Sequence, residues 1–172
     1  MKLYLITLIT IQSFMAFAQN TTLYTTTLDT DNKTVIFNGI VNYQTLVKDS
    51  TCNWLTKDAT NFKANEKAIA TINAATNIHY VVFGGTWCGD TKAQLPKFFA
   101  TMQQANISQT KITMLGVDRT KNTIGNLAKA FCVTNVPTFI ILKAGTEIGR
   151  IIEYGTTNGK VDEEIAAIIE KN

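Results

Sequence analysis

The stretch that most constrains the fold is "IHYVVFGGTWCGDTKAQLP", residues 78–96, in which a strand pattern passes directly into a helix pattern. Its first half is an almost continuous apolar run, which is typical of a strand buried on both faces. From Trp87 to Ala105 the apolar residues then recur near helical spacing, and we expect Pro96 to kink this helix. A buried strand followed at once by a helix predicts a sheet covered by helices.

The rest of the C-terminal half continues this alternation. Gly145 favours a hairpin turn at Ala144–Gly145, and the closing helix carries isoleucines on one face. We expect a buried strand over residues 111–118, a helix over 124–131, two strands within 137–154 and a helix over about 160–170. The order strand, helix, strand, helix, strand, strand, helix predicts an α/β fold with a central mixed sheet flanked by helices.

The N-terminal half is less regular. Residues 20–38 are rich in threonine with weak alternation near residues 34–37, so we expect a flexible start and one short edge strand. Residues 40–48 and 61–76 are predicted to be helices, the second starting near Asn65 and stopping near Asn77, with a loop or short turn over 50–60. We therefore expect a mostly helical extension over residues 19–77 and a single folded domain over 78–172.

Residues 1–18 have the pattern of a signal peptide. Lys2 precedes an apolar stretch over 3–17, and Ala16-Phe17-Ala18 fits a small-x-small cleavage site. The alternative, an N-terminal strand or core helix, is disfavoured because no turn signal or polar face interrupts the run. We expect cleavage after Ala18, a periplasmic or secreted protein, and no stable membrane insertion after cleavage.

Composition excludes several function classes. The net charge of +3 is small and the basic residues are scattered, so we expect no nucleic-acid partner. One histidine and no close Cys/His cluster leave too few ligands for a structural zinc site, so we expect no metal and no cofactor. Redox chemistry or plain burial remains for the three cysteines.

Cys88 is the strongest nucleophile candidate, with burial as an inert thiol as the alternative. It stands at the predicted start of a helix, where unpaired backbone N–H groups and the positive end of the helix dipole favour the thiolate. The thiolate is the form that attacks disulfides.

Three features together resemble the thioredoxin family: "VVFGGTWCGDT", the proline within the following helix, and "NVPTFIILKAG". The resemblance covers about residues 78–170. The resemblance implies a thioredoxin-like fold. It also implies that Cys88 is the nucleophile, Trp87 the aromatic residue before it, and Pro137 a cis-proline whose loop supports substrate backbone through Val136. "WCGD", the N-terminal extension and "EIGRIIE" are similar to a group of exported bacterial thioredoxin-like proteins.

The chain departs from that family at three positions. Asp90 replaces the usual proline, Thr91 replaces the resolving cysteine, and Val82 stands where a buried carboxylate is expected. Thr91 is either an ordinary first-turn residue or a hydrogen-bond donor to the Cys88 sulfur, which would favour the thiolate. The Asp90 carboxylate would oppose thiolate formation by like-charge repulsion. We keep Cys88, Asp90 and Thr91 as candidate catalytic residues.

The other candidates have structural explanations. Cys132 is expected to pack as a small hydrophobe, and His79 is expected to be a satisfied structural histidine rather than a base. Cys52 in the extension could replace the missing resolver only if its Cα lies within about 7 Å of that of Cys88.

Two functions follow. The first is a single-thiol oxidoreductase in which Cys88 reacts with protein or glutathione disulfides and an external thiol resolves the mixed disulfide. The second is a non-catalytic module that binds extended peptides at the cis-proline groove.

The signal-peptide hypothesis predicts a mature chain that begins at Gln19. N-terminal sequencing of the exported protein checks it. A mature protein that retains Met1 would remove the exported assignment.

Overall fold

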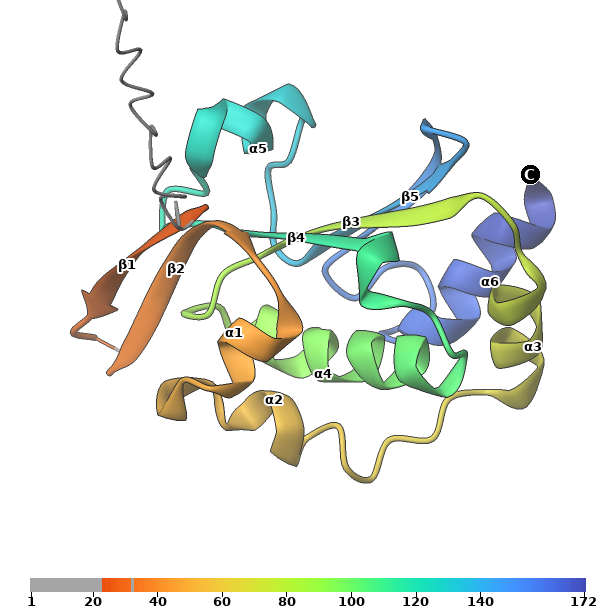
Figure 1. Ribbon diagram of the computed structural model, residues 1–172, viewed down its shortest axis with the longest axis horizontal. Coiled ribbons are helices and arrows are strands. Elements are labelled where there is room, and N and C mark those ends of the chain that lie inside the picture. The colour runs from red at the N-terminus through yellow and green to blue at the C-terminus, as the bar shows by residue number, and fades with distance from the viewer. Residues whose placement is uncertain (1–22, 32) are drawn as a thin grey trace, which may run out of the picture.

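A six-stranded mixed sheet forms the centre of the molecule, in the strand order β1-β2-β4-β3-β5-β6 (Figure 1). The computed structural model describes residues 23–31 and 33–172, so the expected signal peptide and its cleavage site lie outside the described residues. β3 and β4 are parallel and every other neighbouring pair is antiparallel. The strands are β1 (Tyr24–Asp29), β2 (Thr34–Val41), β3 (Ile78–Gly84), β4 (Ile112–Gly116), β5 (Thr138–Lys143) and β6 (Thr146–Ile152).

β3 lies in the middle of the sheet and explains the apolar run of the sequence. Successive side chains of a strand point to opposite faces. Tyr80 and Val82 join one buried cluster, and Val81 and Phe83 join another. Because both faces of β3 are covered, both sets of side chains are apolar, and the predicted buried strand is confirmed.

Helices cover the two faces unequally. Figure 1 shows α1, α2 and α4 on one side of the sheet and α5 on the other. α4 continues through Pro96 and buries Leu95, Phe98 and Met102. The α-helices are α1 (Tyr43–Val47), α2 (Trp54–Lys57), α3 (Glu66–Ala74), α4 (Gly89–Gln104), α5 (Leu127–Ala130) and α6 (Val161–Lys171).

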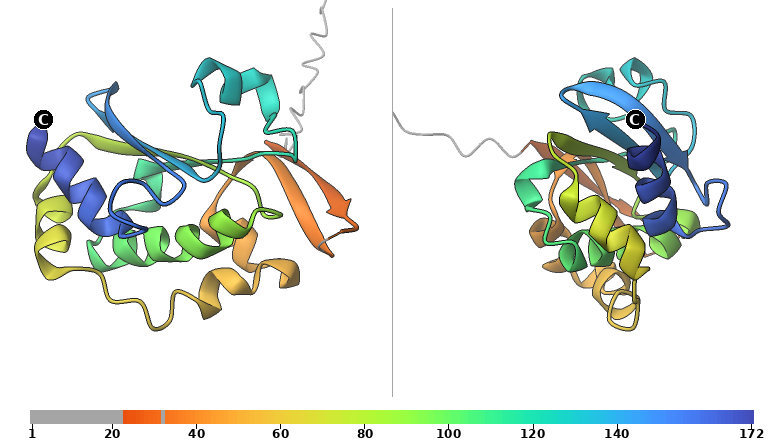
Figure 2. Two further views of the ribbon diagram at one scale, coloured as in Figure 1. Left: turned by 180° about the vertical axis from the view of Figure 1, so that it is seen from behind. Right: turned by 90° about the vertical axis from the view of Figure 1, so that its right-hand side faces the viewer.

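The extension docks on the closing helix. Figure 2 shows α3 and α6 side by side, in agreement with their extensive contact. The backbone N–H of Asn65 donates to the Asp162 carboxylate at 2.7 Å, and Thr71 donates to Glu170 at 3.0 Å. Residues 64 onward are thereby tied to the domain. Among the helices of the described chain, none has both the length and the apolar character needed to cross a membrane.

The extension contains a hairpin where the sequence analysis expected one short strand. β1 pairs along its whole length with residues 34–39 of β2, and β2 continues to Val41, so the helix expected from residue 40 begins only at Tyr43. Asn42 fixes that start because its side chain accepts the Thr45 N–H at 2.8 Å. Likewise the helix expected from residue 61 begins at Glu66, after Asn65 caps it.

Two further boundaries differ from expectation. Residues 50–60 hold a short 3-10 helix (Ser50–Cys52) and α2 rather than a loop alone. The helix expected over 124–131 becomes regular only at Leu127, because Gly125 and Asn126 have φ of 61° and 55°. The hairpin turn at Ala144–Gly145 is confirmed, and both residues have positive φ, as a two-residue hairpin turn requires.

Candidate functional site

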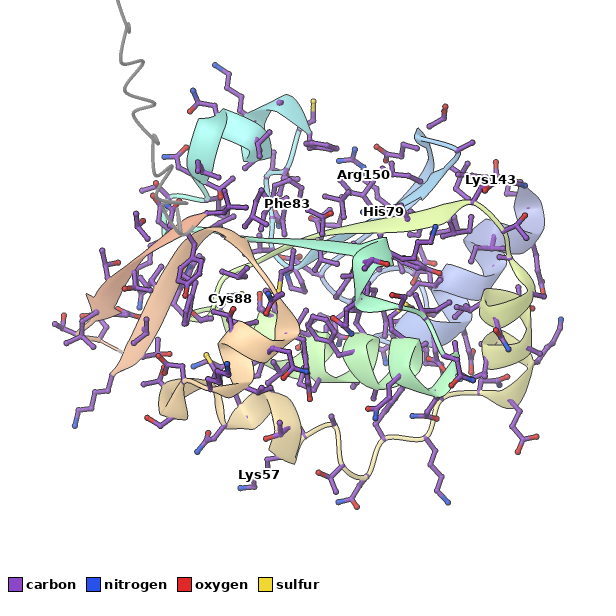
Figure 3. All side chains as sticks on the ribbon, in the orientation of Figure 1. Lys57, His79, Phe83, Cys88, Lys143 and Arg150 are labelled. Carbon is purple, nitrogen blue, oxygen red and sulfur yellow. The ribbon has the colours of Figure 1, made fainter. Side chains whose placement is uncertain are left out.

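The segment that joins β3 to α4 carries Cys88 (Figure 3). The Cys88 N–H donates to the Gly85 carbonyl at 2.9 Å, which closes a tight turn. A Cβ on Gly85 would lie 2.6 Å from the Trp87 ring, so glycine is required there. Cys88 is the N-cap residue of α4, and its carbonyl accepts the Lys92 N–H at 3.1 Å. The nucleophile candidate therefore stands at a helix N-terminus, as expected.

The half-buried Cys88 thiol faces a loop from the other half of the domain. Its Sγ donates to the Val136 carbonyl at 3.3 Å, and the Val136–Pro137 peptide bond is cis. The register of the sheet explains this meeting, because Phe83 at the end of β3 pairs with Thr138 at the start of β5. Cys88, Val136 and Pro137 are thus brought together as the resemblance implied.

Thr91 stabilises the turn that precedes Cys88. Its side chain is fully buried, at 0% exposure, and its Oγ1 accepts the Gly85 N–H at 3.2 Å. Of the two alternatives for Thr91, the hydrogen bond to the Cys88 sulfur is absent from the hydrogen bonds of the described residues. Thr91 therefore positions the backbone around Cys88 and leaves no second thiol at this position.

Asp90 belongs to a small polar group beside Cys88. The Tyr154 hydroxyl donates to the Asp90 side chain, and this hydrogen bond is the main cause of a raised pKa of Tyr154. Partial loss of water and the charges of Asp90, Cys88 and Glu153 raise that pKa further.

Tyr154 was missed by the sequence analysis, because it follows the last strand and belongs to no motif. Its place is fixed by backbone contacts. The N–H of Glu153 donates to the Pro137 carbonyl at 2.7 Å, and the N–H of Gly159 donates to the Tyr154 carbonyl at 2.7 Å. Glu164 holds the intervening loop by accepting hydrogen bonds from the backbone and hydroxyl groups of Thr156 and Thr157.

Trp87 directly precedes Cys88 in the segment between β3 and α4. Its ring is half-buried, and its Nε1 donates to the Val117 carbonyl at 3.0 Å. The guanidinium of Arg119 lies over the ring, 5.5 Å from its centre. Arg119 also escaped the sequence analysis, because its contact with Trp87 depends on the parallel pairing of β3 with β4.

The other two cysteines differ sharply from each other. Cys52 is fully buried, and burial raises the pKa of its thiol to about 11. Cys132 is exposed, so the expectation that it packs in the core is wrong. It follows α5 with φ of 53°, and this left-handed turn takes its side chain away from the core. None of the three cysteines is paired in a disulfide.

His79 and possible metal ligands were the remaining candidates for chemistry. The Nε2 of His79 lies 3.0 Å from the Thr113 hydroxyl across the β3–β4 pair, which agrees with a satisfied structural histidine. Within residues 23–31 and 33–172, no group of three His, Cys, Asp or Glu side chains could hold a metal ion.

These environments predict an order of thiol modification in the native protein. At neutral pH an alkylating reagent should modify Cys88 and Cys132, while Cys52 stays unmodified because it is buried and forms thiolate only as the pH approaches about 11. Mass spectrometry of proteolytic peptides measures this, and the unfolded protein, labelled at all three cysteines, is the control. Labelling of Cys52 at the rate of Cys88 in the native state would contradict the structure.

Comparison with known proteins shows which family this chain is similar to. The thioredoxin family model matches residues 56–171. Thioredoxin H2 of Arabidopsis thaliana is 29% identical over 97 residues, which cover 56% of this chain and 67% of that protein.

Two solved structures are also similar. A protein of unknown function from Pseudomonas aeruginosa has 14% identity and a TM-score of 0.53, with coverage of 76% of this chain and 92% of that one. The thioredoxin of Fasciola hepatica has 25% identity and a TM-score of 0.41, with coverage of 62% of this chain and 88% of that one. Since the family model spans well over half of the sequence, this chain belongs to the thioredoxin family.

Proposed function

We propose that this protein is an exported thiol–disulfide oxidoreductase that uses Cys88 as its single nucleophile and depends on an external thiol for resolution. Membership of the thioredoxin family supports a thiol–disulfide oxidoreductase-like role in general. The observation that carries the finer proposal is the position of the Cys88 thiol, between the start of α4 and the Val136 carbonyl, with a buried threonine where a second thiol would stand.

The proposed reaction has two exchange steps. The Cys88 thiol loses its proton, and the thiolate attacks one sulfur of a disulfide, so that a mixed disulfide forms and the other sulfur leaves as a thiolate that takes up a proton. A thiol of glutathione or of another protein then loses its proton and attacks the substrate sulfur of the mixed disulfide. Cys88 leaves as thiolate, and the substrate departs in a disulfide with that external thiol.

Cys52 is not placed to replace the external thiol. Cys52 belongs to the buried cluster that includes Tyr80 and Val82, whereas Cys88 packs on the cluster that includes Val81 and Phe83. Cys52 is also fully buried and holds its proton to high pH. Its use as a resolver would require opening of the core.

Charged groups near Cys88 tune the first step. Cys88 caps the N-terminus of α4, and the Asp90 carboxylate stands in the first turn of the same helix. The Asp90 side chain also interacts with the Tyr154 hydroxyl, whose pKa it raises. In this proposal Asp90 and Tyr154 set how readily Cys88 reacts at neutral pH.

The second candidate function is a non-catalytic module that binds extended peptides beside Pro137. Two observations favour this function. The buried Val82 stands where the family has a carboxylate, and position 91 holds a threonine instead of a thiol. A turnover assay with glutathione as the external thiol separates the two functions, because a binding module does not turn over disulfide substrates.

In a Cys132→Ser background, which removes the exposed thiol, glutathione disulfide should convert Cys88 to one equivalent of mixed disulfide, and added glutathione should reverse it. Thr91→Cys should in addition form an internal disulfide, because it restores the spacing of paired thiols at the helix start. Intact-protein mass spectrometry measures both products.

Two variants control this test. Cys88→Ser should form no adduct, and Thr91→Ser, which keeps the hydroxyl that accepts the Gly85 N–H, should behave like the parent. If Cys88 forms no adduct while the protein remains folded, the binding module replaces the oxidoreductase as the proposed function.

A further inference from the structure

The N-terminal hairpin contacts the turn that carries Cys88, although it lies outside the region matched by the family model. β1 and β2 end at Val41, whereas the match begins at residue 56. The hydroxyl of Thr86, two residues before Cys88, donates to the Val35 carbonyl of β2 at 2.5 Å. The hairpin is therefore part of the surroundings of the candidate site.

A second contact starts from a buried carboxylate at the end of β1. The side chain of Asp29 is only 4% exposed, and it accepts hydrogen bonds from Arg119 Nε at 3.2 Å and Nη2 at 2.9 Å. A carboxylate removed from water is strongly unfavourable unless it is paired and hydrogen-bonded. Asp29 therefore fixes the guanidinium in one orientation.

The fixed guanidinium in turn restrains the aromatic residue next to the nucleophile. Arg119 lies 5.5 Å over the Trp87 ring, and the ring nitrogen donates to the Val117 carbonyl at 3.0 Å. One face and the polar edge of the indole are thereby occupied by the protein. A side chain already held in one rotamer loses less entropy when a ligand packs on it, so it contributes more to affinity.

We propose that Asp29 and Arg119 are positioning residues that hold Trp87 for extended peptide disulfides, and that the hairpin is a wall of the substrate groove. This inference rests on the proposed function of Cys88. A peptide that lies across the Val136–Pro137 loop and Cys88 extends onto Trp87. A small disulfide reaches Cys88 without that contact.

The distinction between large and small substrates supplies the test. The probes are hydroxyethyl disulfide and a linear peptide with a central cysteine in disulfide linkage to a small thiol. The rate constant for mixed-disulfide formation at Cys88 is measured with both, in the Cys132→Ser background. Asp29→Asn should lower the rate constant for the peptide about tenfold, the size of a typical interface contact, and leave that for the small disulfide within about twofold.

Asp31→Asn is the matched control. Asp31 lies 3.7 Å from the same guanidinium, but its side chain is 77% exposed, and exposed ion pairs contribute little. We expect it to leave both rates unchanged. Arg119→Lys is a second test variant, since lysine keeps the charge but loses the two-pronged hydrogen bonding and the flat stack on the indole.

A spectroscopic measurement reports on Trp87 directly. In a Trp54→Phe background Trp87 is the remaining tryptophan, and Asp29→Asn should shift its emission to longer wavelength, because the released ring gains contact with water. Asp31→Asn should leave the emission unchanged. Thermal unfolding of each variant identifies any that fails to fold, and Arg119→Lys then serves in place of Asp29→Asn.

The outcomes separate the two proposals. Equal loss of rate with both substrates, or no loss with the peptide, overturns the role of Asp29 and Arg119 while leaving Cys88 as the nucleophile. Failure of the parent protein to react with hydroxyethyl disulfide overturns the proposed function and this inference with it.

Discussion

The contact between the Cys88 thiol and the Val136 carbonyl joins the two halves of the domain at the candidate site. It depends on the central position of β3, whose last residues pair with β4 on one side and with β5 on the other. β3 leads directly into α4, and its C-terminal end lies beside the start of β5. The turn that carries Cys88 and the loop that ends in Pro137 therefore lie at the same end of the strands. The apolar core on both faces of β3 keeps these two loops in register.

The lone thiol acts in surroundings built by residues that are far apart in the chain. Thr91 holds the turn from within α4, the Asp90 side chain interacts with Tyr154, and the guanidinium of Arg119 covers the Trp87 ring. In the proposed function, the replacement of a second cysteine by Thr91 leaves resolution to an outside thiol. The protein would then act on its substrates as one partner of a relay rather than as a self-contained dithiol.

Much of this fold can be predicted from hydrophobic periodicity, and the reasons for the failures are physical. β3, α4, the β5–β6 hairpin and α6 have strong patterns because each buries one or both faces. β1 has a weak pattern because most of its side chains are exposed at the edge of the sheet. Helix starts at residues 43 and 66 depend on asparagine caps, and the expected helix before Leu127 is prevented by two residues with positive φ.

Some residues of the candidate site could likewise be predicted from the sequence, and others could not. Cys88, Trp87 and Pro137 stand in local motifs, so their places in the fold could be predicted from the sequence. Arg119 and its partner Asp29 are 90 residues apart, and their pairing requires the sheet order β1-β2-β4 to be known. Cys132 was misassigned because the left-handed turn that exposes it leaves no clear sign in the surrounding sequence.

The central claim is that Cys88 passes through a mixed disulfide with an external thiol. The most direct measurement is mass spectrometry of the protein taken from its own compartment, after acid quenching and alkylation of free thiols. We expect a fraction of the protein to carry a reducible glutathione or protein adduct on the peptide that contains Cys88, and no such adduct at Cys52. Recovery of Cys88 only as alkylated free thiol, under conditions in which known disulfide exchange partners are trapped, would contradict it.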